Sequence, residues 1–160
     1  MRTNSTFARL TCALSVVTAL LLQPAIAAGQ KAASKGIPLS VWKTRTCGCC
    51  GLWVEHMKAN GFDVSVQDVD TLDEIKKKLG ITPALSSCHT ALAGRYVIEG
   101  HIPADVVRRF LKEPPAGVVG LAVPGMPIGS PGMEVPGGRR QPYSVLTFDT
   151  SGRTSVYERR

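Results

Sequence analysis

Apolar residues recur along the first half of this chain with the periods expected of strands and helices. Residues 38–44 form a short apolar segment around Val41 and Trp42, which is typical of a buried strand. Residues 62–69 alternate between apolar and polar side chains, with Phe62 on the apolar side, as a second strand does. We therefore predict two strands, separated by a segment that is long enough for a helix.

Three segments carry the apolar spacing or the end signals of helices. Residues 51–60 have helical character and end before Gly61, where a left-handed C-terminal cap is expected. Residues 71–74 read Thr-Leu-Asp-Glu, a capping box in which the Thr hydroxyl and the Glu carboxylate each satisfy a free backbone amide. A third helix, with apolar residues every four positions, is predicted to open at Pro103 and to end before Pro114.

The order of the predicted elements indicates the fold class. Residues 90–99 contain two short apolar runs around Ala93-Gly94, which predict a hairpin. The resulting order of strand, helix, strand, helix, strand, strand and helix is that of the thioredoxin architecture, with a cysteine motif between the first strand and the first helix. We therefore predict an α/β, thioredoxin-like domain.

The last third of the chain changes in composition. Residues 123–138 contain five glycines and four prolines, so we predict a Gly/Pro/Met-rich loop without regular structure. Residues 143–148 and 153–157 flank a turn sequence and predict a terminal hairpin. This C-terminal β-hairpin is an extension beyond the minimal thioredoxin plan.

The N-terminal residues have the three-part pattern of a secretory signal peptide. Arg2 and Arg9 occur without any acidic residue, residues 10–22 are mostly apolar, and Ala25-Ile26-Ala27 is a small-residue cleavage signal. The apolar run is shorter than the about 20 residues that span a bilayer, so an uncleaved membrane anchor is the weaker alternative. We predict a cleaved signal peptide, export to the periplasm and no stable membrane anchor.

The predicted organisation is therefore simple. It consists of a signal peptide over residues 1–27, a polar linker over residues 28–37 and one metal-binding domain over residues 38–160. The formal net charge is +7, but the basic residues are scattered and the longest run is Lys76-Lys77-Lys78. Because an exported protein rarely meets DNA, we predict that this run is a solvated helix face and that nucleic acid is not a partner.

The cysteines carry the candidate chemistry. Apart from Cys12, in the predicted signal peptide, they lie in two clusters: Cys47-Gly48-Cys49-Cys50 and Cys88, which is followed by His89. In an oxidising compartment such thiols are bridged, redox-cycling or held by metal. Cys47 and Cys50 form a C-x-x-C pair that can close a disulfide, whereas a dithiol oxidoreductase has no use for Cys49. A soft metal ion gains a ligand from that third thiol, so metal binding is the leading interpretation.

The spacing of the cysteines alone does not choose the metal. Four thiolates with one imidazole suit zinc in a closed tetrahedral site, or monovalent copper as a single ion or a thiolate-bridged cluster. Met126 and Met133 lie on two Pro-Gly-Met repeats, and their thioethers favour copper because zinc seldom uses methionine. The alternative is that both methionines pack as adaptable apolar side chains.

The histidines differ in how strongly the sequence favours them as ligands. We predict that His89 is a ligand because the Cys-His pair is expected in a loop before the strand, although a strand would turn the two side chains to opposite faces. His101 is a second-rank candidate, for which a turn role is at least as favoured. His56 lies on the order of 10 Å along the helix from the cysteines, so packing is its expected role. Trp53 is expected in the core or in the pocket wall.

Four segments together resemble the CopG-type periplasmic copper-resistance proteins, a family formerly described only as a domain of unknown function. They occur in the family's order and span essentially the whole mature chain: residues 47–50, 86–90, 96–101 and 120–127. The resemblance implies a thioredoxin-like fold, a multinuclear copper cluster and a role in metal handling or in the redox conversion of copper. The ligands it implies are Cys47, Cys49, Cys50, Cys88 and His89, and the participation of Met126 is left open.

We therefore expect an exported copper-binding protein that sequesters or redox-cycles Cu(I)/Cu(II) in copper resistance and metal homeostasis. Other periplasmic copper-handling proteins are its expected partners. Two alternatives remain at this point: a periplasmic thiol-disulfide oxidoreductase that uses Cys47 and Cys50, and a domain held together by structural zinc. The copper-binding and zinc hypotheses require the two cysteine clusters to meet, whereas the oxidoreductase hypothesis needs only the first cluster.

Overall fold

The computed structural model describes residues 36–160. The predicted signal peptide and most of the predicted linker lie outside the described residues, so both stay predictions. Within the described part of the chain, none of the helices combines the length and the apolar character that crossing a membrane requires.

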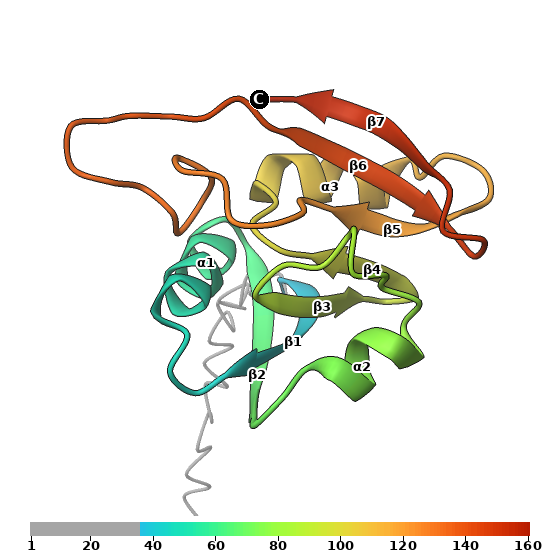
Figure 1. Cartoon of the computed structure of the whole chain (residues 1–160), viewed down its shortest axis with the longest axis horizontal. Coiled ribbons are helices and arrows are strands. Elements are labelled where there is room, and N and C mark those ends of the chain that lie inside the picture. Colours follow the sequence, from blue (N-terminus) through green and yellow to red (C-terminus); the bar gives the residue numbers. More distant parts are fainter. Residues whose placement is uncertain (1–35) are drawn as a thin grey trace, which may run out of the picture. The chain divides into compact units, whose positions relative to one another are not determined.

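Residues 36–160 form one mixed α/β unit built on a seven-stranded sheet (Figure 1). The strands lie in the order β2-β1-β3-β4-β5-β6-β7. The elements, in chain order, are β1 Ile37–Thr44, α1 Gly48–Ala59, β2 Phe62–Val69, α2 Asp73–Lys78, β3 His89–Ala93, β4 Tyr96–Glu99, α3 Ala104–Lys112, β5 Val118–Ala122, β6 Ser144–Asp149 and β7 Thr154–Arg159.

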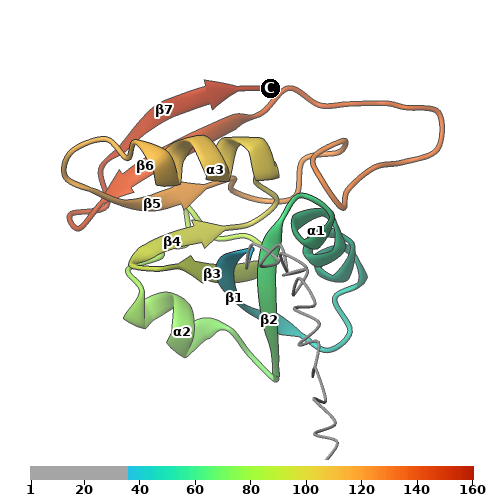
Figure 2. The same ribbon diagram turned by 180° about the vertical axis from the view of Figure 1, so that it is seen from behind.

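The helices cover both faces of the sheet. Neighbouring residues of a strand point to opposite faces, and in β3 the ring of His89 packs on Trp53 of α1 while Thr90 bonds to Lys76 of α2. α1 and α2 therefore lie on opposite faces. Helix α3 shares the core of α1, because Trp53 donates a 2.9 Å hydrogen bond from its indole nitrogen to the carbonyl of Ile102 just before α3. Figure 2 shows α3 lying across β5 and β6.

Most of the predicted elements are confirmed. β1 and β2 pair in parallel on either side of α1, and β3 and β4 form the predicted hairpin. α1 begins earlier than predicted, at Gly48, so Cys49 and Cys50 lie in its first turn. The α/β class is thus confirmed for residues 36–160, while its finer description as thioredoxin-like stays a prediction.

The terminal hairpin is confirmed, but its relation to the rest of the fold differs from the prediction. β6 and β7 pair antiparallel, as expected. The strand β5, which the sequence pattern did not reveal, lies between this hairpin and the domain, parallel to β4 and antiparallel to β6. The hairpin therefore continues the main sheet.

Helix α2 differs from the prediction in two ways. Its six residues start at Asp73, and the hydroxyl of Thr71 accepts a 3.2 Å hydrogen bond from the Asp73 amide, without the reciprocal Glu bond of a capping box. Lys76 is also buried, contrary to the prediction of a solvated Lys run, because its ammonium group pairs with the buried carboxylate of Glu99. Only Lys77 and Lys78 of that run are exposed.

The Gly/Pro/Met-rich segment forms an ordered loop without a strand or helix, as predicted. Turns fold it back on itself, with the Gly129 amide donating to the Met133 carbonyl at 2.9 Å. Gly132 lies against the first turn of α1, where an added Cβ would come within 2.6 Å of the Cys49 carbonyl oxygen. The loop therefore covers the cysteine end of α1, as Figures 1 and 2 both indicate.

The joint between β4 and β5 generates a prediction. Gly120 has no room for a side chain, because an added Cβ would clash with the Val97 carbonyl of β4 and touch the Phe148 ring of β6. Gly120→Ala is expected to lower the free energy of unfolding by about 1–3 kcal/mol or more, as overpacking does. Urea unfolding measures the change.

Gly51→Ala is the matched control for this measurement. Its added Cβ meets nothing within 4 Å in α1, so the same chemical change should stabilise the protein by about 0.5–1 kcal/mol through helix propensity. Equal free energies of unfolding for the two variants would contradict the described packing of β5.

Candidate metal centre

The first cysteine cluster lies where β1 passes into α1. β1 ends at Thr44, whose carbonyl accepts a 3.1 Å hydrogen bond from the Cys47 amide. Cys47 is the N-cap of α1, so Cys49 and Cys50 follow within the first turn. The first-turn amides of a helix have no intrahelical partner and the dipole is positive there, which favours thiolate over thiol.

The second cluster reaches the first through strand pairing. β3 pairs antiparallel with β1, and Lys43 near the end of β1 lies opposite His89 at the start of β3. Cys88, one residue before β3, is thereby carried to the N-terminus of α1. The expected convergence of the two clusters is confirmed, because the Sγ atoms of Cys47, Cys49, Cys50 and Cys88 all lie within 4.8 Å of one another.

The four sulfur atoms are not equivalent. Cys47 and Cys50 are joined as a disulfide, the pairing that the C-x-x-C spacing made available. Cys49 and Cys88 are free, and both are partly buried. The Cys49 sulfur lies 3.6 Å from that of Cys47 and 3.9 Å from that of Cys88, so it stands between the disulfide and the second cluster.

His101 belongs to the cluster, although sequence reasoning placed it in the second rank. Its Nε2 atom lies 2.9 Å from the Cys88 sulfur, while its Nδ1 donates a 2.8 Å hydrogen bond to the Pro131 carbonyl. A proton held on Nδ1 leaves the Nε2 lone pair directed at the sulfur, which is how a histidine is prepared to bind a metal.

A signal for this placement was present in the sequence. The predicted turn follows Ala93, and in the structure Ala93 pairs with Tyr96 and Thr90 with Glu99. Extending this antiparallel register by two residues brings His101 opposite Cys88. A firm assignment of the turn would therefore have raised His101 to the first rank.

His89 is close to the cysteine cluster, but for a different reason from the one predicted. The residue is the first of β3 and does not precede the strand in a loop. Its ring is fully buried, stacks on Trp53 at a centroid distance of 4.3 Å and meets His101 edge-on at 4.9 Å. Nδ1 lies 3.5 Å from the Cys88 sulfur, and Nε2 has no hydrogen-bond partner among residues 36–160. A buried polar atom without a partner is costly, which fits a role for this ring as a metal ligand.

Burial sets the protonation of these groups. It raises the pKa of the Cys88 thiol to about 12, with the neighbouring Cys49 sulfur adding to the rise. Burial also lowers the pKa of His101, and it lowers that of His89 well below its usual value, helped by the charges of His101 and Lys76. The resting pair is therefore a neutral thiol facing a neutral imidazole, and both can exchange a proton for a metal ion.

Cys88 joins two overlapping donor groups. One consists of the four cysteine sulfurs, and the other of Cys88, His89 and His101, whose ligand atoms also lie within 4.8 Å of one another. A thiolate can bridge two soft ions. The arrangement offers a sulfur-rich position and a mixed nitrogen-sulfur position that share one ligand.

The other candidates lie at or outside the margin of the site. Met126 is half exposed, on a loop that is tied to the Cys88 segment by a 3.1 Å hydrogen bond from the Gly125 amide to the Ser86 carbonyl. Met133 is partly buried in the same loop, and a ligand role for either methionine stays a prediction. His56 accepts a 3.1 Å hydrogen bond from the Ala104 amide at the start of α3, a packing role as expected.

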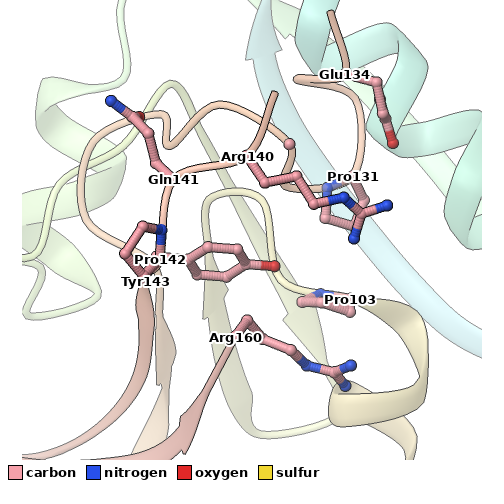
Figure 3. Close-up of a pocket in the computed structure, with 9 residues that line it drawn as sticks. Pro103, Pro131, Glu134, Arg140, Gln141, Pro142, Tyr143 and Arg160 are labelled. Carbon is pink, nitrogen blue, oxygen red and sulfur yellow. The ribbon is translucent and has the colours of Figure 1, made fainter. Parts of the chain in front are cut away.

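A cleft of about 470 Å³ borders the site through Pro131 (Figure 3). Its lining includes Glu134, Arg140, Tyr143 and Arg160 but no cysteine or histidine. Arg160 is engaged with Asp105 and Glu158, so its charge is largely balanced. Because its lining offers no cysteine or histidine, the cleft is not a site for a soft metal ion.

Comparison with known proteins connects this geometry to a family. A family model described as "Protein of unknown function, DUF411" matches residues 85–133, which include the Cys-His motif, His101 and the first part of the loop, up to Met133. No curated protein sequence matches the chain well enough to add to this comparison.

Two solved structures match the chain over most of its length. They are titled "Copper resistance protein copG- Form 1" and "Copper resistance protein copG- Form 2", and they are 38% and 39% identical to this chain, with a TM-score of 0.73 for each. Each match covers 78% of this chain and 98% of the other. The chain therefore belongs to the CopG family of copper resistance proteins.

Proposed function

We propose that this protein binds copper and sequesters it or redox-cycles it between Cu(I) and Cu(II) in copper resistance. One observation carries the proposal: sulfur atoms from two separate motifs, Cys47 to Cys50 and Cys88, lie within 4.8 Å of one another beside two imidazoles. Soft thiolate donors favour monovalent copper, and the two related structures are named as copper resistance proteins.

The donor set supports copper better than a structural zinc ion. A closed zinc site uses four ligands in a tetrahedron, whereas this site offers four sulfurs and two imidazoles. One of these imidazoles, the buried ring of His89, has a nitrogen, Nε2, without a hydrogen-bond partner among the described residues. We propose that more than one copper ion binds, with Cys88 as a shared ligand.

The disulfide makes copper loading depend on redox state. Metal binding needs thiolates, so Cys47 and Cys50 become ligands only after an external dithiol has reduced their disulfide by exchange, giving two thiols here while the donor is itself oxidised to a disulfide. The reduced sulfurs then lie at the N-terminus of α1, where the helix dipole favours their ionised form. We propose that the reduced protein is the copper-loading form.

Two further parts of the proposal come from the sequence. The pattern of residues 1–27 supports export to the periplasm, where other copper-handling proteins are the expected partners. The element order and the sheet order β2-β1-β3-β4 support a thioredoxin-like core to which β5, β6 and β7 are added.

A thiol-disulfide oxidoreductase is the second candidate, and the disulfide between Cys47 and Cys50 is the observation that favours it. A C-x-x-C disulfide at a helix N-terminus is the arrangement that dithiol-disulfide exchange uses. Against this candidate stands Cys49, whose sulfur contacts both the disulfide and Cys88 and which such an exchange does not require.

Anaerobic Cu(I) titration of the reduced protein tests the main proposal. Cys49→Ser and Cys88→Ser should each weaken binding by more than the about 10–100-fold that loss of an outer-shell partner costs, because a serine oxygen is a hard donor. Competition with a chromophoric Cu(I) chelator measures the affinity. Retention of several copper ions by the double variant would contradict the proposal.

Cys88→Ser also separates the two candidates. Dithiol exchange through Cys47 and Cys50 needs neither Cys88 nor metal, so an oxidoreductase would keep its metal-free insulin reduction in this variant. A copper-binding protein would instead lose copper affinity in this variant, and it would show little insulin reduction either as the wild type or as Cys88→Ser.

His101 is the histidine that the structure adds to the candidate site. His101→Gln removes the imidazole nitrogen that faces Cys88 and should weaken Cu(I) binding by at least about tenfold. His56→Gln is the matched control, because a Gln oxygen can still accept the Ala104 amide and His56 lies outside the cluster. Equal copper affinities for the two variants would remove His101 from the site.

The affinity for Cu(I) should depend on pH. The pKa of the Cys88 thiol is raised to about 12, so the thiol is protonated throughout the neutral range and copper must displace its proton. The affinity for Cu(I) should therefore rise with pH, by about tenfold per unit for this one proton, without levelling off below pH 9. Competition titrations between pH 6 and 9 measure the slope, and a flat profile would contradict the protonated resting state.

A further inference from the structure

The sulfur atoms of Cys47, Cys49, Cys50 and Cys88 and the rings of His89 and His101 form the candidate metal pocket. The opposite face of the sheet holds a buried charged network around Glu99. This carboxylate is completely buried at the end of β4 and pairs with the ammonium group of Lys76 from α2. Thr90 of β3 donates a 2.6 Å hydrogen bond to Glu99 Oε2 and accepts a 3.1 Å hydrogen bond from Lys76. None of these groups contacts the sulfur cluster, and copper binding as proposed above does not use them.

The third contact of the carboxylate reaches the segment that carries Cys88. Glu99 Oε1 accepts a 2.6 Å hydrogen bond from the backbone amide of Ser87, the residue before Cys88. The other arm of the carboxylate bonds to Thr90, two residues after Cys88. One buried side chain therefore holds both residues that flank the Cys-His pair, Ser87 by its backbone amide and Thr90 by its hydroxyl.

The two residues after Glu99 contact the same segment. Gly100 has a φ of +79°, and an added Cβ would come within 2.6 Å of the Ser87 side chain, so only glycine lets the segment lie this close. His101 then directs Nε2 at the Cys88 sulfur. Three consecutive residues thus hold the Cys88 segment by a hydrogen bond, by close packing and by a contact with the sulfur.

We propose that Glu99, itself held by Lys76 and Thr90, is a positioning residue that fixes the Cys88 sulfur in the metal pocket through the Ser87 amide. The proposal rests on the proposed copper binding for its purpose, but its geometry is a property of the metal-free protein. An ionised or amide oxygen at position 99 can accept the Ser87 amide, whereas an alkyl side chain cannot.

A buried ion pair requires the two partners to be changed together, since removal of one leaves the other charge buried and unpaired. Lys76→Met therefore serves as the common background. In it, Glu99→Gln keeps an oxygen for the Ser87 amide, and Glu99→Leu removes it. The comparison of the two double variants isolates the hydrogen bond from the loss of the charge.

Two readouts distinguish positioning from mere stability. In reduced, metal-free protein, the alkylation rate of Cys88 relative to that of Cys49, measured by peptide mass spectrometry, should rise in Lys76→Met/Glu99→Leu. The same variant should lose about 10–100-fold in Cu(I) affinity, the range for outer-shell partners of a metal site. Glu99→Gln in the same background should restore most of both properties. Urea unfolding of each variant, carried out alongside, shows that folded protein is compared.

The hydrogen-exchange rate of the Ser87 amide in the wild-type protein keeps the proposal open to refutation even if the Leu variant does not fold. The Ser87 amide, whose acceptor is buried, should exchange with deuterium only through an opening of the structure. Exchange of this amide at the rate of an exposed loop, or an unchanged relative Cys88 alkylation rate in a folded Leu variant, would overturn the proposal. Both measurements are made without copper, so they fail or succeed separately from the copper titration.

Discussion

The assembly of the candidate metal pocket depends on the pairing of β1 with β3. This backbone register sets Lys43 opposite His89 and so carries Cys88 to the N-terminus of α1, where the other three cysteines lie. Side chains alternate between the faces of a strand, so a slip of one residue would turn His89 towards α2 and Thr90 towards Trp53. The convergence of these candidate ligands from distant segments is therefore specified by main-chain hydrogen bonds before any bound ion contributes.

The two faces of β3 carry opposite solutions to the burial of polar groups. On the α2 side, Glu99, Lys76 and Thr90 satisfy one another and the Ser87 amide, as a buried network must to be stable. On the α1 side, His89 Nε2 is buried without a partner in the described part of the chain. Among the described residues, the one buried side-chain nitrogen or oxygen without a partner thus lies on the face of β3 that carries the candidate ligands, and a bound metal ion would recover part of that cost.

Sequence reasoning recovered the elements with a clear period and the residues with distinctive chemistry. β2 followed from alternation and the β3–β4 hairpin from two short apolar runs, while the convergence of the cysteine clusters was expected from the predicted fold and the metal-binding hypothesis. β5 was missed because Val118–Ala122 is short, interrupted by Gly120 and buried without alternation. Lys76 was misassigned because a run of three lysines looks solvated, and its partner Glu99 is 23 residues away. His101 depended on a turn register that composition does not fix.

The carbonyl of Pro131 gives the Gly/Pro/Met-rich loop a role that its composition conceals. By accepting a hydrogen bond from the Nδ1–H group of His101, this carbonyl selects one of the two neutral tautomers of the imidazole. A transplant of the two cysteine motifs and His101 into another α/β scaffold would lack that acceptor, so the ring would be free to flip. A loop without a cysteine or histidine of its own is thus part of the minimal unit that must be moved if the centre is to be rebuilt elsewhere.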